Sequence, residues 1–133
     1  MIKILVVEDQ PRARRILAEA AQVAGANVQT AESAEEAIQA IAQDVFDVVI
    51  TDLKMETDQA GFDVVKAAKE KDVLTQVIVI TAYGKPQVSV TIMSLGAFDY
   101  LEKNAPGTDI FSMIKSKVTL ALDYRTARLR DRG

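Results

Sequence analysis

The feature that most constrains the fold is a series of short apolar runs, rich in β-branched residues, separated by segments with helical spacing. The runs span residues 2–7, 28–31, 46–51, 76–81 and 98–102. Where apolar residues fill a run without alternation, as in 2–7 and 76–81, we expect a strand buried on both faces. Such strands need helices on both sides of the sheet.

The intervening segments carry helix signals. Ser33 followed by Glu36 is a capping-box pattern that begins one helix, and Gly25 is a typical helix stop. The other predicted helices begin near Pro11, Gly61, Lys85 and Thr108 or Asp109. Strands that alternate with helices, joined by right-handed crossovers, predict an α/β fold with a parallel sheet covered on both faces.

Composition narrows the chemistry. The 133 residues can build one substantial core, so one domain is expected. The chain has no cysteine and no histidine, which leaves carboxylates, hydroxyls and lysines to carry any reaction. A net charge of −3 without a basic run argues against direct nucleic-acid or membrane-surface binding. No signal peptide or bilayer-spanning stretch is evident, so we expect a cytoplasmic protein.

Polar residues follow the apolar runs at the point where each predicted strand ends. Glu8 and Asp9 follow the first run, Asp52 the third, Thr81 closes the fourth and Lys103 follows the fifth. Ligand sites of doubly wound sheets lie at the carboxyl ends of the strands. If the strand order is 2-1-3-4-5, the three carboxylates converge at one sheet edge.

Converging carboxylates require a counter-charge. Two unit charges about 4 Å apart repel by about 4 kcal/mol at an effective dielectric constant of about 20. Oxygen ligands without imidazole favour magnesium. Magnesium, the Lys103 ammonium and the Thr81 hydroxyl could together stabilise the oxygens of a transferring phosphoryl group, with Asp52 as the nucleophile that forms an acyl phosphate.

As a set, these residues resemble the receiver domains of two-component response regulators, over residues 1 to about 122. The resemblance implies a flavodoxin-like doubly wound sheet of five parallel strands in the order 2-1-3-4-5. It implies that a histidine kinase or phosphotransfer protein phosphorylates Asp52. It also implies a Mg²⁺ site, which Mn²⁺ can also fill, formed by Glu8, Asp9, Asp52 and the backbone carbonyl of Lys54.

The same resemblance assigns the switch residues. Thr81 and Lys103 match the family's switch hydroxyl and phosphate-pairing lysine, and Tyr100 matches the aromatic residue whose rotamer follows that hydroxyl. Phosphorylation is expected to change partner binding, with homodimerisation through the fourth helix, fifth strand and last helix as the leading expectation. Lys54 and Tyr83 occupy loop positions that tune phosphoryl lifetime in this family.

Three features depart from the family pattern. Glu56 follows Met55 where the family usually has proline, and Gly61 comes one place later than usual. Asn104 follows Lys103 where the family usually has a cis proline. Glu56 and Asp58 also add negative charge near the expected pocket, which bears on metal affinity or kinase docking.

Each residue taken singly has a plainer interpretation. Glu8 and Asp9 can cap a helix, Asp52 can be a turn aspartate, and Lys103 can be a solvated strand end. Thr81 is common in strands, and Tyr100 can be a packed edge aromatic. Residues 123–133 extend the last helix, either as a solvated, arginine-rich end or as a linker or dimer seam through Leu122 and Leu129.

The sequence therefore predicts a phosphoryl-accepting receiver domain that is no enzyme beyond its own phosphorylation and dephosphorylation. Three alternative functions would each require other sequence features. A phosphorylation-independent interaction module would have a damaged pocket, and a flavodoxin-like cofactor binder would need a glycine- and hydroxyl-rich loop where Glu8 and Asp9 stand. An aspartyl-phosphate hydrolase would need a lid and a second acid for general catalysis.

Overall fold

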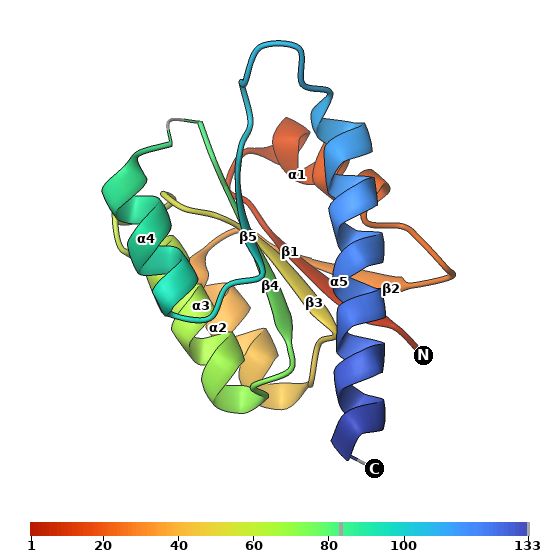
Figure 1. Cartoon of the computed structure of the whole chain (residues 1–133). Helices are drawn as coiled ribbons and strands as arrows, with labels where there is room; N and C mark the ends of the chain where they lie inside the picture. Colours follow the sequence, from red (N-terminus) through yellow and green to blue (C-terminus); the bar gives the residue numbers. More distant parts are fainter. Residues whose placement is uncertain (83, 133) are drawn as a thin grey trace.

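The computed structural model describes residues 1–82 and 84–132, which form a three-layer α/β sandwich (Figure 1). In chain order the elements are β1 Lys3–Val7, α1 Pro11–Ala20, β2 Asn27–Ala31, α2 Ala34–Gln43, β3 Val48–Asp52, α3 Ala60–Lys71, β4 Gln76–Thr81, α4 Pro86–Ser94, β5 Asp99–Glu102 and α5 Ile110–Arg132. Within the described part of the chain, no helix is both long and apolar enough to cross a bilayer.

The sheet confirms the predicted topology. All four strand pairings are parallel, and the order is β2-β1-β3-β4-β5. The central strands β3 and β4 are buried along their whole length, as their unbroken apolar runs predict. Helices α1 and α5 cover one face, and α2, α3 and α4 cover the other (Figure 1).

Each face of the sheet has its own core. Leu5, Val49 and Val79 point to the side of α2 and α3, whereas Ile50 and Ile80 point to the side of α1 and α5. This division follows from the period of two along each strand. The two cores hold the sheet rigid between its helices, so its edges can carry polar residues at defined positions.

Local signals placed several helix ends correctly. The Ser33 hydroxyl accepts a hydrogen bond from the Glu36 amide at 3.1 Å and caps α2, as the capping-box pattern predicts. Pro11 occupies the first turn of α1. Asp109 accepts from the Phe111 amide at 3.1 Å at the start of α5, which identifies it as the capping residue of the two candidates.

Helix α5 runs without interruption through residue 122 to Arg132 and is anchored by a buried arginine. The side chain of Arg125 donates to Asp47 Oδ1 at 2.9 Å and to Asp72 Oδ2 at 3.1 Å. Arg125 is only 8% exposed. A solvated helix end therefore describes the exposed Arg128 and Arg130 but not Arg125.

The anchor predicts a stability difference along α5. Replacing Arg125 by alanine leaves two partly buried carboxylates without their cation and should lower the free energy of unfolding by about 2–3 kcal/mol. Arg128→Ala, on the same extension, should change it by less than about 0.5 kcal/mol. Urea unfolding followed by circular dichroism measures both, and equal small effects would show that α5 is not held by this contact.

Candidate functional site

The candidate site is formed where β1, β3, β4 and β5 end, toward the top of Figure 1. Strand register brings the ends together, because Val7 lies opposite Thr51 and Asp52 lies opposite Ile80. The residues that follow Val7 are therefore neighbours of Asp52. Thr81 lies opposite Glu102, the last residue of β5, so Lys103 lies one residue beyond the paired strand ends. The Lys103 amide donates to the Thr81 carbonyl at 2.8 Å.

Three carboxylates meet at this edge, as expected from the sequence. Glu8, Asp9 and Asp52 each offer an oxygen, and these oxygens all lie within 4.8 Å of one another. Glu8 is fully buried and Asp52 is 9% exposed, whereas Asp9 is exposed to solvent. A cluster with one exposed and two buried carboxylates can hold a cation and leave an open side for a substrate.

The lysine that follows β5 lies inside this cluster. Lys103 Nζ donates to Glu8 Oε1 at 2.6 Å and to Asp52 Oδ2 at 2.9 Å. The Lys103–Asn104 peptide, like all those in the described ranges, is trans. Lys103 Nζ nevertheless reaches both carboxylates. The substitution of asparagine for the family's proline thus leaves the ammonium in the pocket.

Burial and charge set the protonation of Glu8. Burial raises the pKa of Glu8 to about 7; the hydrogen bond from Lys103 opposes this rise, and the neighbouring carboxylates of Asp9 and Asp52 add to it. The pKa of Lys103 is raised, because its bonds to Glu8 and Asp52 outweigh the opposing effect of burial. One lysine therefore does not fully compensate the acidic cluster, and the site favours a further positive charge.

The helix-capping interpretation of Glu8 and Asp9 finds little support in the geometry. The residue at the N-cap of α1 is Gln10, and no side chain caps the helix there. Glu8 Oε2 accepts a hydrogen bond from the Gln10 amide at 3.2 Å, while its other oxygen binds Lys103. Glu8 thus faces the pocket.

Two further polar residues lie along β4 and β5. Thr81 is 5% exposed at the end of β4. The ring of Tyr100 packs against the core on the α2 and α3 side, and its hydroxyl is buried without a hydrogen-bond partner among the described residues. A buried hydroxyl without a hydrogen bond costs about 1–3 kcal/mol, and a rotamer that gave the Tyr100 hydroxyl a partner would relieve that cost.

The loop after β3 completes the site. Leu53 donates its amide to Asp52 Oδ1 at 2.7 Å and to the Ile80 carbonyl at 3.0 Å, which fixes the start of the loop. Gly61 is needed at its end, because a Cβ there would lie 2.6 Å from Leu53 Cα. Lys54, the expected carbonyl ligand, is exposed between these two points. Tyr83 lies outside the described residues.

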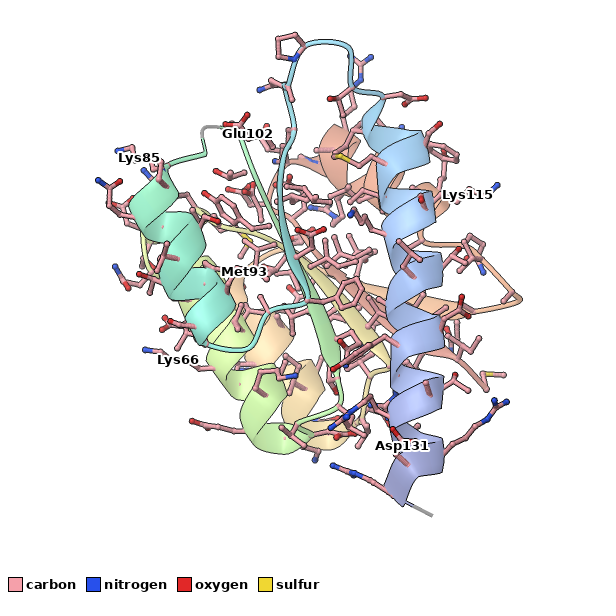
Figure 2. The ribbon with its side chains drawn as sticks, viewed as in Figure 1. Lys66, Lys85, Met93, Glu102, Lys115 and Asp131 are labelled. Carbon is pink, nitrogen blue, oxygen red and sulfur yellow. The ribbon has the colours of Figure 1, made fainter. Side chains whose placement is uncertain are left out.

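Two acidic contacts near the site were not foreseen from the sequence. Glu102 accepts a hydrogen bond from the Gly84 amide at 2.8 Å and so joins the end of β5 to the loop before α4. Figure 2 labels Glu102. The Glu56 carboxylate binds amides at the N-terminus of α2. Neither contact has a local sequence signal, since both partners are remote in the chain.

Comparison with known proteins places the chain in a family. The response regulator receiver domain pattern matches residues 4–115. The transcriptional regulator DctD of Pseudomonas aeruginosa is 30% identical over 130 residues, which cover 96% of this chain and 28% of DctD. The chain thus spans less than a third of that relative.

Solved structures agree. The signal receiver domain of a LuxO-like repressor from Vibrio parahaemolyticus is 27% identical, with a TM-score of 0.85 over 99% of this chain and 98% of that one. The beryllofluoride-activated NtrC4 receiver domain dimer is 26% identical, with a TM-score of 0.80 over 94% of this chain and 99% of that one. The chain therefore belongs to the response regulator receiver domain family.

Proposed function

We propose that this chain accepts a phosphoryl group on Asp52 from a histidine kinase or phosphotransfer protein, in the cytoplasm, and relays the signal by changing a protein–protein contact. The observation that carries the proposal is the joint position of Lys103 and the acidic cluster around Asp52. The ammonium lies 2.9 Å from Asp52 Oδ2, and Glu8 and Asp9 offer oxygens within 4.8 Å of one from Asp52.

The residues fit a magnesium ion. Glu8, Asp9, Asp52 and the backbone carbonyl of Lys54 would bind the ion. Mn²⁺ also prefers oxygen ligands and could replace Mg²⁺ there. Bound there, the ion would neutralise the carboxylates and the charge on the phosphoryl oxygens. Lys103, at present shared between Glu8 and Asp52, would then be free to pair with a phosphoryl oxygen.

Asp52 performs the covalent step. One carboxylate oxygen forms a bond to phosphorus while the phosphorus–nitrogen bond of the phosphohistidine donor breaks, and the electron pair returns to the imidazole. Lys103 stabilises the negative charge on the transferring oxygens. In dephosphorylation a water oxygen attacks phosphorus, the bond between phosphorus and the Asp52 oxygen breaks, and inorganic phosphate leaves as the Asp52 carboxylate is regenerated. The chain thus catalyses only its own phosphorylation and dephosphorylation.

The signal passes through Thr81 and Tyr100. A phosphoryl group adds a charge of about −1.5 to −2 beside Lys103 and the Thr81 hydroxyl, which would draw both toward it. Tyr100 stands two strand positions before Glu102. Its hydroxyl has no hydrogen-bond partner among the described residues, so a rotamer change that supplied one would be favourable. The proposed readout is therefore the face formed by α4, β5 and α5, with no direct nucleic-acid binding by this domain.

Phosphorylation chemistry predicts a single modified residue. Incubation with acetyl phosphate and Mg²⁺ should add the mass of one phosphoryl group to the wild-type chain, and chelation of Mg²⁺ should suppress the addition. Asp52→Asn should show none, because an amide oxygen cannot form the acyl phosphate. Asp63→Asn, an exposed residue on α3, is the matched control and should react like wild type. Intact mass spectrometry reads all three; an unmodified wild type would favour a phosphorylation-independent interaction module.

The raised pKa of Glu8 predicts pH-dependent metal binding. Glu8 holds a proton below about pH 7 in the metal-free protein, and a protonated carboxyl is a poor ligand. The dissociation constant for Mg²⁺ should therefore rise as pH falls through about 7, by up to about tenfold per pH unit. Calorimetric titration at several pH values measures it. Glu8→Gln should bind Mg²⁺ more weakly and lose this dependence; an unchanged dependence would assign it to another group.

The readout face predicts association on activation. Val90 and Met93 on α4 are 70% and 42% exposed, and Leu120 on α5 is 51% exposed, so the face can bury apolar area against a second copy. Figure 2 labels Met93 on α4. The similar NtrC4 receiver domain forms a dimer when activated by beryllofluoride. Beryllofluoride should convert this chain from monomer to dimer in sedimentation velocity.

The controls for this prediction use exposed valines. Val90→Glu should prevent the dimer, because a charge would be buried at the contact. Val45→Glu, at a residue that is 43% exposed in the loop between α2 and β3 and so outside α4, β5 and α5, should dimerise like wild type. A wild type that stays monomeric at high concentration with beryllofluoride would overturn the dimer proposal and leave the phosphorylation proposal intact.

A further inference from the structure

Glu56 makes a contact that links two separate elements. Its Oε1 accepts a hydrogen bond from the Ala34 amide at 2.9 Å, and its Oε2 accepts one from the Glu35 amide at 3.2 Å. These amides belong to the first turn of α2, whose own cap, Ser33, binds the next amide, that of Glu36. A side chain from the loop after β3 thus completes the N-terminus of α2, where backbone amides and the helix dipole favour a carboxylate.

The ionisation of Glu56 agrees with this placement. Burial acts to raise its pKa, but the backbone hydrogen bonds, including those from Ala34 and Glu35, outweigh it and lower the pKa. The carboxylate is therefore charged at neutral pH, and both of its oxygens are engaged. Charge-assisted bonds of this kind are stronger than bonds between neutral groups.

The loop that carries Glu56 also carries Lys54. At its start, Leu53 is fixed by Asp52 and by the Ile80 carbonyl, and the Leu53 carbonyl accepts a bond from the Gly61 amide at 2.8 Å. Between Leu53 and Gly61 the backbone bonds are local and longer, such as that from the Met55 amide to the Thr57 carbonyl at 3.3 Å. Glu56 ties this middle portion to a helix, two residues after Lys54.

We propose that Glu56 is a positioning residue for the metal site, acting through the backbone at Lys54. By holding the loop against α2, it restricts the backbone around Lys54 and lowers the entropy lost when the Lys54 carbonyl binds a cation. This inference rests on the proposed function, in which Lys54 supplies a carbonyl ligand. Glu56 itself faces α2 and is not a ligand.

Two simpler roles make different predictions. If Glu56 only caps α2, removing the other cap of that helix should have the same effect on metal binding. If Glu56 only contributes negative charge near the cation, removing another charge from the same loop should have the same effect. Ser33 and Asp58 provide these comparisons: Ser33 caps α2 from within its own segment, and Asp58 is an exposed acid of the same loop.

The experiment compares Glu56→Ala and Glu56→Gln with Ser33→Ala and Asp58→Asn. Mg²⁺ binding to each unphosphorylated protein is titrated by calorimetry, and urea unfolding verifies that each variant is folded. Glu56→Ala should weaken Mg²⁺ binding by about threefold or more, since outer contacts of metal ligands often carry tenfold effects. Glu56→Gln keeps one oxygen acceptor and should lose less Mg²⁺ affinity than Glu56→Ala. Ser33→Ala and Asp58→Asn should bind within about twofold of wild type.

A second readout follows the loop itself. Hydrogen exchange of the Ala34 and Glu35 amides and of the loop amides 54–57 should accelerate in Glu56→Ala, whereas in Ser33→Ala the loop amides should keep their protection. Equal Mg²⁺ affinity of Glu56→Ala and wild type, or an equal loss in Asp58→Asn, would overturn the positioning role. A wild type that binds no Mg²⁺ would instead overturn the proposed metal site, so the two failures are distinguishable.

Discussion

Electrostatic repulsion among Glu8, Asp9 and Asp52 is the interaction on which the rest of the site depends. Lys103 relieves it in part through bonds of 2.6 Å to Glu8 and 2.9 Å to Asp52. The relief is incomplete, because Glu8 is fully buried and its pKa is raised to about 7. The fold thus holds the three carboxylates together at a cost in folding free energy, and a second cation in the site would offset that cost. A stable scaffold can tolerate such a cost at a functional site.

The scaffold can bear this cost because the sheet beneath it is buried and rigid. Strands β3 and β4 are buried along their length, and separate cores on the two faces hold them. Parallel register then places the residue after one strand beside the residue after the next. Contacts between loops complete the site: Glu102 binds the Gly84 amide, and Glu56 binds the first turn of α2.

The fold and most of the site could be predicted because their signals are local or periodic. Strand order, the Ser33 cap and the meeting of the three carboxylates at one edge all agree with the sequence-based expectations. The hydrogen-bond partners of Arg125 and Glu56 could not be predicted from the sequence. Arg125 looks like one of several arginines on a polar helix end, yet it pairs with Asp47 and Asp72, which are remote in the chain. Glu56 is expected from the sequence only as added charge near the pocket, and its bond to the first turn of α2 has no signal in the sequence.

The sequence by itself determined which chemistry is available and where along the chain it stands, since a chain without histidine or cysteine leaves carboxylates, hydroxyls and lysines at the ends of apolar runs. Periodicity also determined the layers, because side-chain direction repeats every two residues in a strand and about every 3.6 in a helix. Only the tertiary structure decided which charges pair, that Glu8 is buried while its neighbour Asp9 is exposed, and which way the Tyr100 ring points. Those outcomes depend on distances and desolvation between segments far apart in the chain, and the order of residues does not encode such distances locally.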